Sequence, residues 1–519
     1  MKNNFTLAAL LLLALSGAAQ ADAPFQECRF CDKRYENLGQ LKLANADFTG
    51  TYLYGANLSW SVVKDGKFRS AVLSFARLEW SDFDGADFSK ASLEDAAMSR
   101  STFHDTDFRM ANLSRANLAR SDMAGAKFVT ATLRDARLTD ARLAGADMRQ
   151  ANLTGADLSG ARLRDTDFQG AILKRADLQG CDLANANFNG AILDGATLRA
   201  VDIRQANFRS ASMKGTDFRN AVLDAVNFQD ADLSGADFTG AVLSNVLLQG
   251  AKICDTKLPD GSVFDCAQKA PGGGIEQRAL LRGSARNENV VRVSVAGNAF
   301  SNFQKGLPAG IVAEAAAQVF KQMGRDAGFI AMPTDAALKT LETGRLDAAT
   351  VVFKTPKIKD KYYFSDPVVT DYQVVVVRKG RSFDLQKRSD LYGKRLGGRL
   401  GYRYELVDRD PAINIQRYQS DGEMIRALLL DEVDGVLLAG ISDVYALRSE
   451  GIMSQLETLK ASVGTVPLMV AFAKSRFKQE DVEQFNAALK GLLEGAGWKD
   501  IVEHNGMGDL VQPLPPISE

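Results

Sequence analysis

Hydrophobic residues recur at every fifth position through the first half of the chain. The series begins at Phe48 and ends at Ile253, and each of its 42 members is Leu, Phe, Met, Val or Ile. Two positions before each member stands a small residue, mostly Ala, and the other three positions are mostly polar. An α-helix repeats about every 3.6 residues and a strand about every two, so the pattern predicts neither of them.

The period instead predicts a square coil whose backbone turns a corner after each pentad. Four pentads, or about 20 residues, would close one turn, with the large and the small apolar residues both pointing inward. The second inward residue has to be small because four faces converge on a narrow axis. At about 4.8 Å between neighbouring strands, the coil would form a rod about 50 Å long.

The pattern is clearest in "ANLSRANLAR" (111–120) and "ADLSGADFTG" (231–240). These segments resemble the pentapeptide-repeat family, whose consensus is A(D/N)LXX, and the resemblance extends over about residues 36–258. It implies a right-handed quadrilateral β-helix. A disordered segment would not keep an apolar residue at every fifth position.

The charge of the chain does not favour a nucleic-acid partner. Some pentapeptide-repeat proteins are acidic mimics of DNA, but residues 41–260 hold 26 basic and 28 acidic residues. The whole chain has 63 Lys and Arg against 64 Asp and Glu, so we expect no binding of nucleic acid. A rod whose basic and acidic residues nearly balance favours the interpretation as a scaffold or protein-docking module.

The N-terminus has the layout of a secretory signal peptide. Lys2 precedes the apolar run "LAALLLLALSGAA", and small residues suit cleavage near Ala21 or Ala23. We expect residues 1–23 to be removed and the mature protein to enter the periplasm. No other stretch approaches the roughly 20 apolar residues of a membrane span, so we expect the mature protein not to span a membrane.

Five cysteines in an oxidising compartment leave one unpaired. Cys181 occupies a small inward position of the repeat, where it would be a buried thiol. Cys28 and Cys31 precede the rod, whereas Cys254 and Cys266 follow it, and ends about 50 Å apart exclude pairing between the two sets. We predict the disulfides Cys28–Cys31 and Cys254–Cys266, which would close the exposed ends of the stack.

A redox or metal-binding role for Cys28 and Cys31 is the alternative. Redox pairs with this spacing usually begin a helix in a βαβ context, and a zinc site would need two more ligands nearby. The sequence shows neither, and its only histidines are His104 and His504. We therefore predict no metal site and no cofactor.

The pattern changes at "AQKAPGGGIEQRALLRGSARNEN" (267–289), which marks a domain boundary. Beyond it, periodicity predicts strands at 290–297, 347–353 and 372–380 and helices at 310–324 and 336–344. Strands alternating with helices indicate an α/β domain with mainly parallel strands. The predicted divisions are a signal peptide (1–23), an N-terminal cap (24–42), the repeat rod (43–258), a C-terminal cap and linker (259–289), the α/β domain (290–508) and a tail (509–519).

Several stretches of this domain resemble the family 3 extracellular solute-binding proteins. The clearest are "LETGRLDAATV" (341–351), "TPKIKDKYYFSDPVVTDYQVVVVRKG" (355–380) and "GWKDIVEHNG" (497–506), and their order also fits the family. The resemblance spans about residues 290–508. It implies the type II periplasmic receptor fold, in which two lobes joined by a hinge close on a ligand in the cleft.

Two charged anchors of the family's amino-acid receptors are absent. Such receptors carry an Arg three residues after the Thr of the "TPxR" segment, and counting from Thr355 gives Ile358. They also place an Asp about five residues after the "VDA" Asp, and counting from Asp434 gives Ala439. An unpaired buried ligand charge is costly, so the resemblance implies a solute other than an ordinary free amino acid.

Other residues of the cleft could replace these anchors. In the loop after "RLGG", where the family holds an anion with backbone amides, Arg403 could clamp a carboxylate or phosphate. Tyr402 or Tyr404 could stack on a planar group. The candidate ligand-binding residues are Phe300, Phe303, Phe353, Lys354, Thr355, Arg399, Gly401, Tyr402, Arg403 and Tyr404. The alternative is that they are structural and the cleft holds no small molecule.

We therefore predict a non-enzymatic periplasmic solute-binding protein whose repeat rod is a scaffold or docking module. Its partners would be a small polar solute, with an anionic compound as one candidate, and a membrane transporter or a sensor protein. The alternative is a periplasmic scaffold in which both halves bind proteins. The receptor fold can also precede a lytic transglycosylase domain, but too few residues follow about position 510 to form one, so we expect no enzymatic activity.

Overall fold

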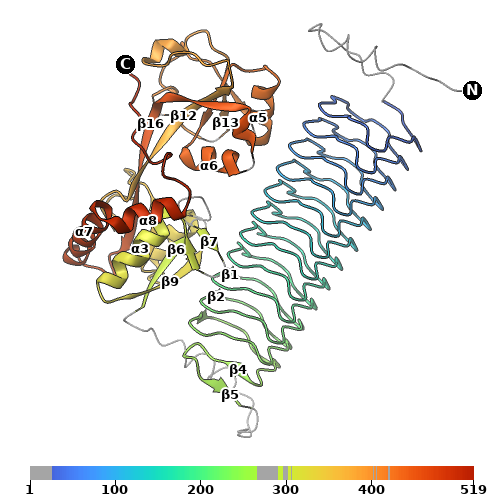
Figure 1. Ribbon diagram of the computed structural model, residues 1–519. Helices are drawn as coiled ribbons and strands as arrows, with labels where there is room; N and C mark the ends of the chain where they lie inside the picture. The colour runs from blue at the N-terminus through green and yellow to red at the C-terminus, as the bar shows by residue number, and fades with distance from the viewer. Residues whose placement is uncertain are drawn as a thin grey trace, which may run out of the picture.

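The protein is described from a computed structural model. A rod formed by the N-terminal half lies beside a two-lobed α/β unit formed by the C-terminal half (Figure 1). The structure describes residues 26–265, 290–295, 302–304, 307–332, 334–400, 402–404, 406–418, 421–449 and 451–518.

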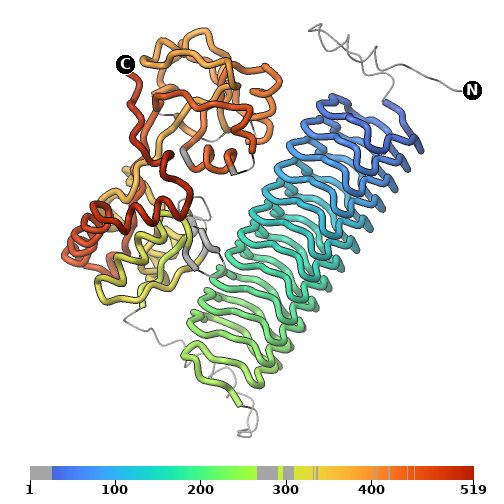
Figure 2. Tube along the Cα trace, in the orientation of Figure 1, coloured from blue at the N-terminus to red at the C-terminus, as the bar shows by residue number. Residues whose placement is uncertain are grey.

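The rod is a regular stack of coils, as the tube in Figure 2 shows. Parallel bridges join residues that are 20 apart, from Glu27 with Asp47 to Asp237 with Lys257, so four pentads close one turn as predicted. Three turns near the C-terminal end of the rod have bridges long enough to form strands, which pair in parallel. These are β1 (Asp202–Arg204), β2 (Val222–Asp224) and β3 (Val242–Ser244).

The axis of the coil holds the two predicted inward residues of each pentad. Ala156 and Leu158, for example, are both 0% exposed. Aromatic residues in successive turns stack on one another, because a position in one coil lies directly over the same position in the next. One such ladder, with ring centroids 4.6–5.3 Å apart, consists of Phe48, Phe68, Phe88, Phe108 and Phe128.

The backbone conformation and hydrogen bonds at the corners of the coil account for many of the polar residues of the repeat. The last residue of each pentad has a positive φ, as at Gly155 (71°) and Asp135 (54°), a conformation that Gly, Asn and Asp adopt more readily than other residues. The Asp or Asn between the two inward residues accepts a hydrogen bond from the backbone two residues later. Asp157 Oδ1, for instance, lies 3.0 Å from the amide nitrogen of Ser159.

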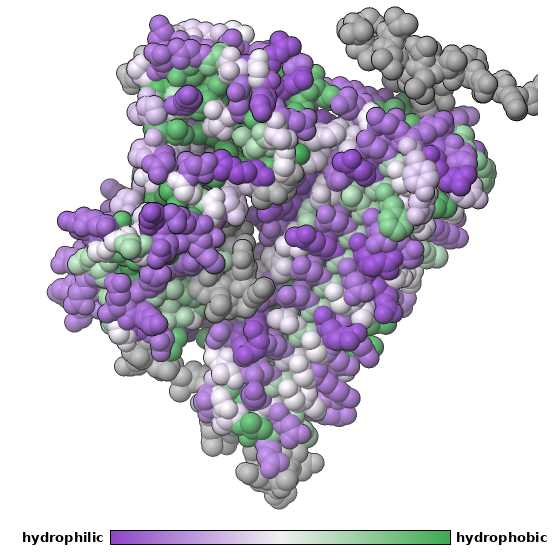
Figure 3. Space-filling view, viewed as in Figure 1, coloured by the Kyte–Doolittle hydropathy of each residue, from purple (hydrophilic) through white to green (hydrophobic). Residues whose placement is uncertain are grey.

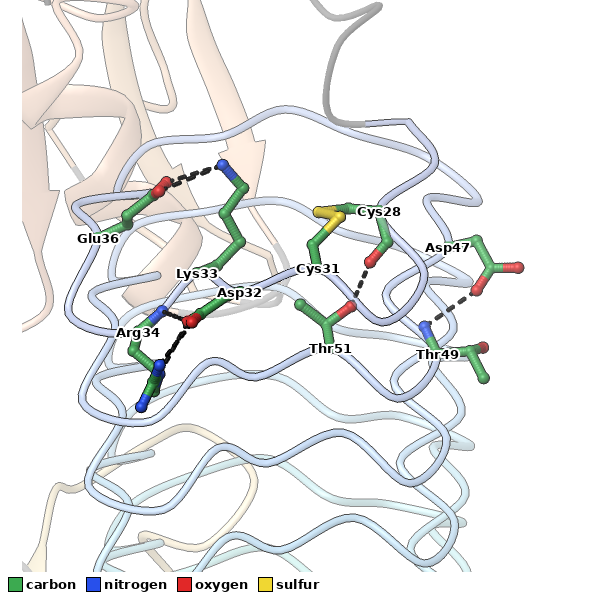
Figure 4. Close-up of a disulfide and its surroundings, with 9 residues drawn as sticks. All are labelled: Cys28, Cys31, Asp32, Lys33, Arg34, Glu36, Asp47, Thr49 and Thr51. Carbon is green, nitrogen blue, oxygen red and sulfur yellow. Dashed lines mark hydrogen bonds and ion pairs between the residues drawn. A yellow bond between two sulfur atoms is a disulfide. The ribbon is translucent and has the colours of Figure 1, made fainter. Parts of the chain in front are cut away.

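The cysteines agree with the predicted pattern where the structure describes them. Cys28 and Cys31 form a disulfide at the N-terminal end of the rod, where Thr51 Oγ1 also donates to the Cys28 carbonyl oxygen (Figure 4). Cys181 is a buried free thiol whose Sγ donates to the Leu158 carbonyl oxygen, 3.0 Å away. Cys254 is disulfide-bonded, and its predicted partner, Cys266, lies outside the described residues.

A short hairpin follows the last coil, and the α/β unit then contains all five elements predicted for it. The hairpin consists of β4 (Thr256–Lys257) and β5 (Val263–Phe264). The later strands are β6 (Val290–Val295), β7 (Asn302–Gln304), β8 (Leu307–Ala309), β9 (Asp326–Ala331), β10 (Ala348–Val352), β11 (Tyr362–Phe364), β12 (Val369–Arg378), β13 (Leu396–Arg399), β14 (Ile415–Tyr418), β15 (Gly435–Leu438) and β16 (Leu456–Ala473). The helices are α3 (Ile311–Gln322), α4 (Thr334–Glu342), α5 (Asp421–Leu429), α6 (Ile441–Ser449), α7 (Gln479–Glu494) and α8 (Ala496–His504), with 3-10 turns at η3 (Arg388–Leu391) and η4 (Ile452–Ser454).

The strands run in the order β14-β13-β15-β12-β16-β10-β6-β9, and β11 pairs with β16. Lobe one contains β6, β9 and β10 with α3, α4, α7 and α8, and lobe two contains β13, β14 and β15 with α5 and α6 (Figure 1). The long strand β16 passes through both lobes and pairs with β12 at the crossing. In the described part of the chain, no helix is both long and apolar enough to cross a membrane.

His104 is the one histidine of the rod, and it lies between two carboxylates. Its Nδ1 is 3.1 Å from Asp84 Oδ1, and its Nε2 is 3.3 Å from Asp122 Oδ1. The hydrogen bonds to Asp122 and Asp84 raise the pKa of His104 to about 10. This imidazole is therefore a structural cation that joins neighbouring turns.

Replacing Ala156 by Leu should destabilise the rod, because the added carbons would overpack the axis. Overpacking of this kind costs about 1–3 kcal/mol of unfolding free energy. The matched control is Ala144→Leu, which adds the same atoms at an exposed position. Urea unfolding should show a lower midpoint for Ala156→Leu alone, and equal midpoints would contradict the inward assignment.

The stability provided by His104 should decline in alkali. Because the pKa is raised in the folded rod, the contribution is complete below the unfolded value of about 6.5 and is lost as the pH rises towards about 10. The melting temperature should therefore fall less between pH 6 and pH 9 in His104→Gln than in the wild type. His504→Gln, at an exposed position of α8, is the control and should keep the wild-type slope. If His104→Gln keeps that slope too, the charged imidazole does not stabilise the rod.

Candidate functional site

The hinge between the lobes is formed by β12 and β16. The two strands pair antiparallel, and the register shifts on both sides of Val374. The preceding residue, Gln373, is buried, and its Nε2 donates to the carbonyl oxygen of Arg403, 3.0 Å away. This bond ties the lobe-two loop that contains Arg403 to the crossing strands.

The loop after β13 is supported from inside by Tyr404. The side chain is 0% exposed; its hydroxyl donates to the Leu437 carbonyl oxygen at 2.8 Å and accepts the Arg399 N–H at 3.1 Å. The Tyr404 N–H donates to Asp408 Oδ2, 2.8 Å away. Tyr404 therefore shapes the loop, and Tyr402, which is 50% exposed, is the tyrosine that can stack on a ligand.

The two arginines of this loop differ in their surroundings. Arg399 is mostly buried, and its Nη1 lies 2.5 Å from Asp421 Oδ2 at the start of α5. Burial alone would lower the pKa of Arg399, but the charge of Asp421 outweighs it and the pKa is raised. The side chain of Arg403 is exposed, so it is the arginine open to a solute. Gly401 lies outside the described residues.

A carboxyl group lies close to Ala439, although the residue itself is apolar. Asp443, in the first turn of α6, accepts the Ala439 N–H at 3.1 Å. Burial, and after it the charge of Asp421, raises the pKa of Asp443 well above its ordinary value. Counting to the family's anchor position does not find this residue. Asp443 stands four residues later, in the first turn of α6, and an acidic residue soon after the apolar run "GVLLAG" was the available signal.

A second acidic residue reaches the same loop from the hinge. Asp371 of β12 is 8% exposed, and a Cβ built on Gly440 would lie 2.0 Å from Asp371 Oδ2. The absence of a side chain at Gly440 therefore lets this carboxylate touch the backbone next to Ala439. With Asp421 and Asp443, lobe two offers carboxyl groups beside its arginines. The arrangement can pair a positive as well as a negative group of a solute.

The candidate residues of lobe one follow an unusual backbone conformation. Val351 has a φ of 57°, which is rare for a β-branched residue and often marks a functional segment. The next residues leave β10: Phe353 is 52% exposed, Lys354 is exposed with its Nζ 5.7 Å from the Phe364 ring centroid, and Thr355 is half-buried. The positive φ of Val351 coincides with a register shift between Ala349 and Val352 in the pairing of β10 with β16, just before the strand ends.

The position that carries the anchoring Arg of the "TPxR" segment in amino-acid receptors is apolar in lobe one. The Ile358 N–H donates to the Thr355 carbonyl oxygen at 3.1 Å, and its side chain packs against the lobe-one core. Phe303 lies on β7, and Phe300 is outside the described residues. Within the described ranges, no hydrogen bond or ion pair joins Phe353–Thr355 to the loop 402–404. The two sets are therefore brought to different lobes and are not in polar contact.

Comparison with known families identifies both halves of the chain. Residues 37–65, 67–100, 96–135 and 131–170 match pentapeptide repeats, and residues 183–258 match a pentapeptide repeat region. Residues 291–506 match the bacterial extracellular solute-binding proteins of family 3.

Two curated relatives match part of the second half. The L-cystine-binding protein TcyJ of Escherichia coli strain K12 is 28% identical over 132 residues, which are 25% of this chain and 50% of that protein. A provisionally named amino-acid ABC transporter-binding protein, PatH, of Vibrio harveyi is 33% identical over 121 residues, which are 22% of this chain and 48% of that protein. The chain spans about half the length of these relatives. Their names give no support to the predicted exclusion of amino acids.

Solved structures resemble each half separately. HetL, a pentapeptide repeat protein from Nostoc sp. strain PCC 7120, is 30% identical, covers 45% of this chain and 94% of its own, and has a TM-score of 0.29. A mutant of ArgBP from T. maritima is 20% identical, covers 42% of this chain and 94% of its own, and has a TM-score of 0.33. From the family matches, the chain joins pentapeptide repeats in its N-terminal half to a family 3 bacterial extracellular solute-binding domain in its C-terminal half.

Proposed function

We propose that this protein is a non-enzymatic periplasmic receptor that binds a small polar solute in the cleft between its two lobes. The observation that carries the proposal is the loop 402–404, where Tyr404 and Gln373 fix a backbone that presents Tyr402 and Arg403 outward. A supported loop with exposed aromatic and cationic side chains suits recognition of a ligand better than a purely structural turn.

Arg403 is the proposed anchor for an anionic group of the solute. Its guanidinium can form two parallel hydrogen bonds with a carboxylate or phosphate, and no acidic side chain in the described structure is paired with it. Arg399 cannot take this role without leaving Asp421. Ile358 and Ala439 still distinguish the site from the usual amino-acid receptors, but Asp371 and Asp443 supply carboxyl groups nearby. Amino acids therefore remain among the candidate solutes.

The proposed location and partners follow from the same domain. The signal-peptide pattern of residues 1–23 supports export to the periplasm, and those residues lie outside the described part. The relatives are named as binding proteins, one of them for an ABC transporter, which supports delivery of solute to a membrane transporter. The other proposed role is signalling, in which the solute-bound protein contacts a sensor protein.

A thermal-shift screen of the full chain tests this function. The protein would first be unfolded and refolded to remove carried-over ligand, and then mixed with amino acids, cystine, organic acids, polyamines, sugars and phosphate. A ligand present at 100 times its dissociation constant stabilises a protein by about 2.7 kcal/mol, which gives a clear shift. No shift across the panel would favour a scaffold whose cleft binds proteins.

Arg403→Ala should abolish the shift produced by an anionic hit while leaving the melting temperature of the free protein unchanged. The reason is that Arg403 is exposed and supports no described contact through its side chain. Arg381→Ala, which removes an exposed arginine after the end of β12, is the matched control and should keep the shift. If Arg403→Ala binds the anionic compound with unchanged affinity, Arg403 is not the anchor.

A further inference from the structure

The residues of the rod that touch the α/β unit lie on one column of the coil and at the corners beside it. An unbroken series of parallel bridges, each 20 residues long, runs from Lys42 through Asp82 to Asp202, Val222 and Val242. We call this series the 42–242 column. Its members lie one above another along a single edge of the rod, and the space-filling view shows the rod and the α/β unit packed side by side (Figure 3).

Lobe two is attached near the N-terminal end of this column. Trp80, at the adjoining corner, is 5% exposed and belongs to the same apolar cluster as Ile425 and Leu428 of α5. Its indole stacks on Trp60 at 5.1 Å, and the Arg100 guanidinium lies 4.9 Å from its ring centroid. A Trp–Trp–Arg stack therefore lies along this corner of the rod and is buried at its centre by lobe two.

Two ion pairs reinforce the lobe-two attachment. Lys42 Nζ lies 2.5 Å from Glu432 Oε1, and Arg426 Nη2 lies 4.0 Å from Asp82 Oδ2. The second pair is almost completely buried, with side-chain exposures of 13% for Arg426 and 2% for Asp82. Asp82 Oδ2 also lies 3.0 Å from Lys64 Nζ within the rod, so Arg426 adds a contact across the interface to a carboxylate that the rod already pairs.

Lobe one is attached further along the same column. Val222 is 3% exposed and belongs to the same apolar cluster as Ile330 of β9 and Leu341 of α4, and Val242 packs against this cluster. Arg345, which follows α4, forms an ion pair with Asp224. This attachment is smaller than the one on lobe two, since it relies on two valines and one ion pair.

Between the attachments, the column passes close to the ligand loop of lobe two. Burial lowers the pKa of Arg162, and the charges of Arg142 and Arg399 lower it further, whereas Tyr402 acts in the opposite direction. Arg142 in turn contributes to the electrostatic surroundings of Tyr402. Charges of the column therefore act on the ligand loop of lobe two, between the two attachments.

We infer that the rod is an intramolecular brace that holds the two lobes at a fixed separation, and that the lobes close on a solute only when the attachment to lobe one opens. Seven coil turns separate Asp82 from Val222, a distance of about 34 Å along the column. Because the coil is packed to its axis, this distance does not change. Rotation of the lobes about the hinge strands β12 and β16 must therefore break one attachment, and the smaller one is on lobe one. The closure of the lobes on a solute rests on the proposed function, whereas the bracing of the lobes by the rod does not.

Exchanging the charges of the Asp224–Arg345 pair tests the brace without any solute. Asp224→Arg or Arg345→Asp should each repel the rod from lobe one, whereas the two changes together should restore the contact. Spin labels on cysteines introduced at the exposed positions Ser389 of lobe two and Lys490 of lobe one would report the separation by double electron–electron resonance. The background carries Cys181→Ala, since Ala fills this inward position in most pentads.

Each single reversal should broaden the distribution of distances between the lobes, and the double exchange should narrow it to the wild-type width. The matched control is Asp147→Arg, which breaks the ion pair with Arg149 on a different column of the rod and should leave the distribution unchanged. Identical distributions in the wild type and both single reversals would overturn the brace. Restored width in the double exchange would show that the broadening comes from the lost ion pair and not from a general loss of structure.

The two proposals fail in different ways. If the single reversals broaden the distribution but the thermal-shift screen finds no ligand, the brace stands and the proposed function falls. If a screened compound binds and the distributions do not differ, the function stands and the brace falls. For any compound that does bind, each single reversal should lower the dissociation constant several-fold, because less free energy is then spent on releasing lobe one. An unchanged dissociation constant would contradict the release of this attachment during closure.

Discussion

The closure of the coil every 20 residues is the constraint on which the rest of the structure depends. It places each residue over its counterpart in the next turn, so each pentad directs one large apolar side chain inward together with a second inward residue that is mostly Ala and in several pentads Ser or Thr. The same closure converts the outer positions into straight columns. The α/β unit contacts one of these columns and the corners beside it, and the orientation of both lobes relative to the rod is therefore set by the geometry of the repeat.

Most of the fold could be predicted from the sequence because it depends on local periodicity. The period of five gave the inward positions, the number of pentads in a turn and the buried thiol of Cys181, since each follows from a residue's place within its own pentad. The Cys28–Cys31 disulfide followed from the length of the rod. In the α/β unit, alternation and helical periodicity located the strands and helices, which also form from short stretches of chain.

The candidate site was predicted less completely because it depends on contacts between distant segments. Tyr404 and Tyr402 are two residues apart and look equivalent in the sequence, yet one supports the loop from within and the other is open. Asp371 of β12 reaches the backbone between β15 and α6, where Gly440 leaves room for its carboxylate. Such relations have no periodic signal, since they arise when separate strands meet.

The sequence contains a signal for the contact between the rod and the receptor domain, but the signal appears at a period of 20 residues and not at a period of five. Trp60, Trp80, Val222 and Val242 are apolar residues at outward positions, and their numbers fall on two adjoining columns when they are compared at intervals of 20. One pentad inserted between Asp82 and Val222 would preserve the inner packing but turn every later column by a quarter of a circle, so that Val222 and Val242 would face away from lobe one. Whole coils could be added only by lengthening the interval by about 4.8 Å each. The number of coils in this interval is thus set by the width of the receptor domain and not by the stability of the rod.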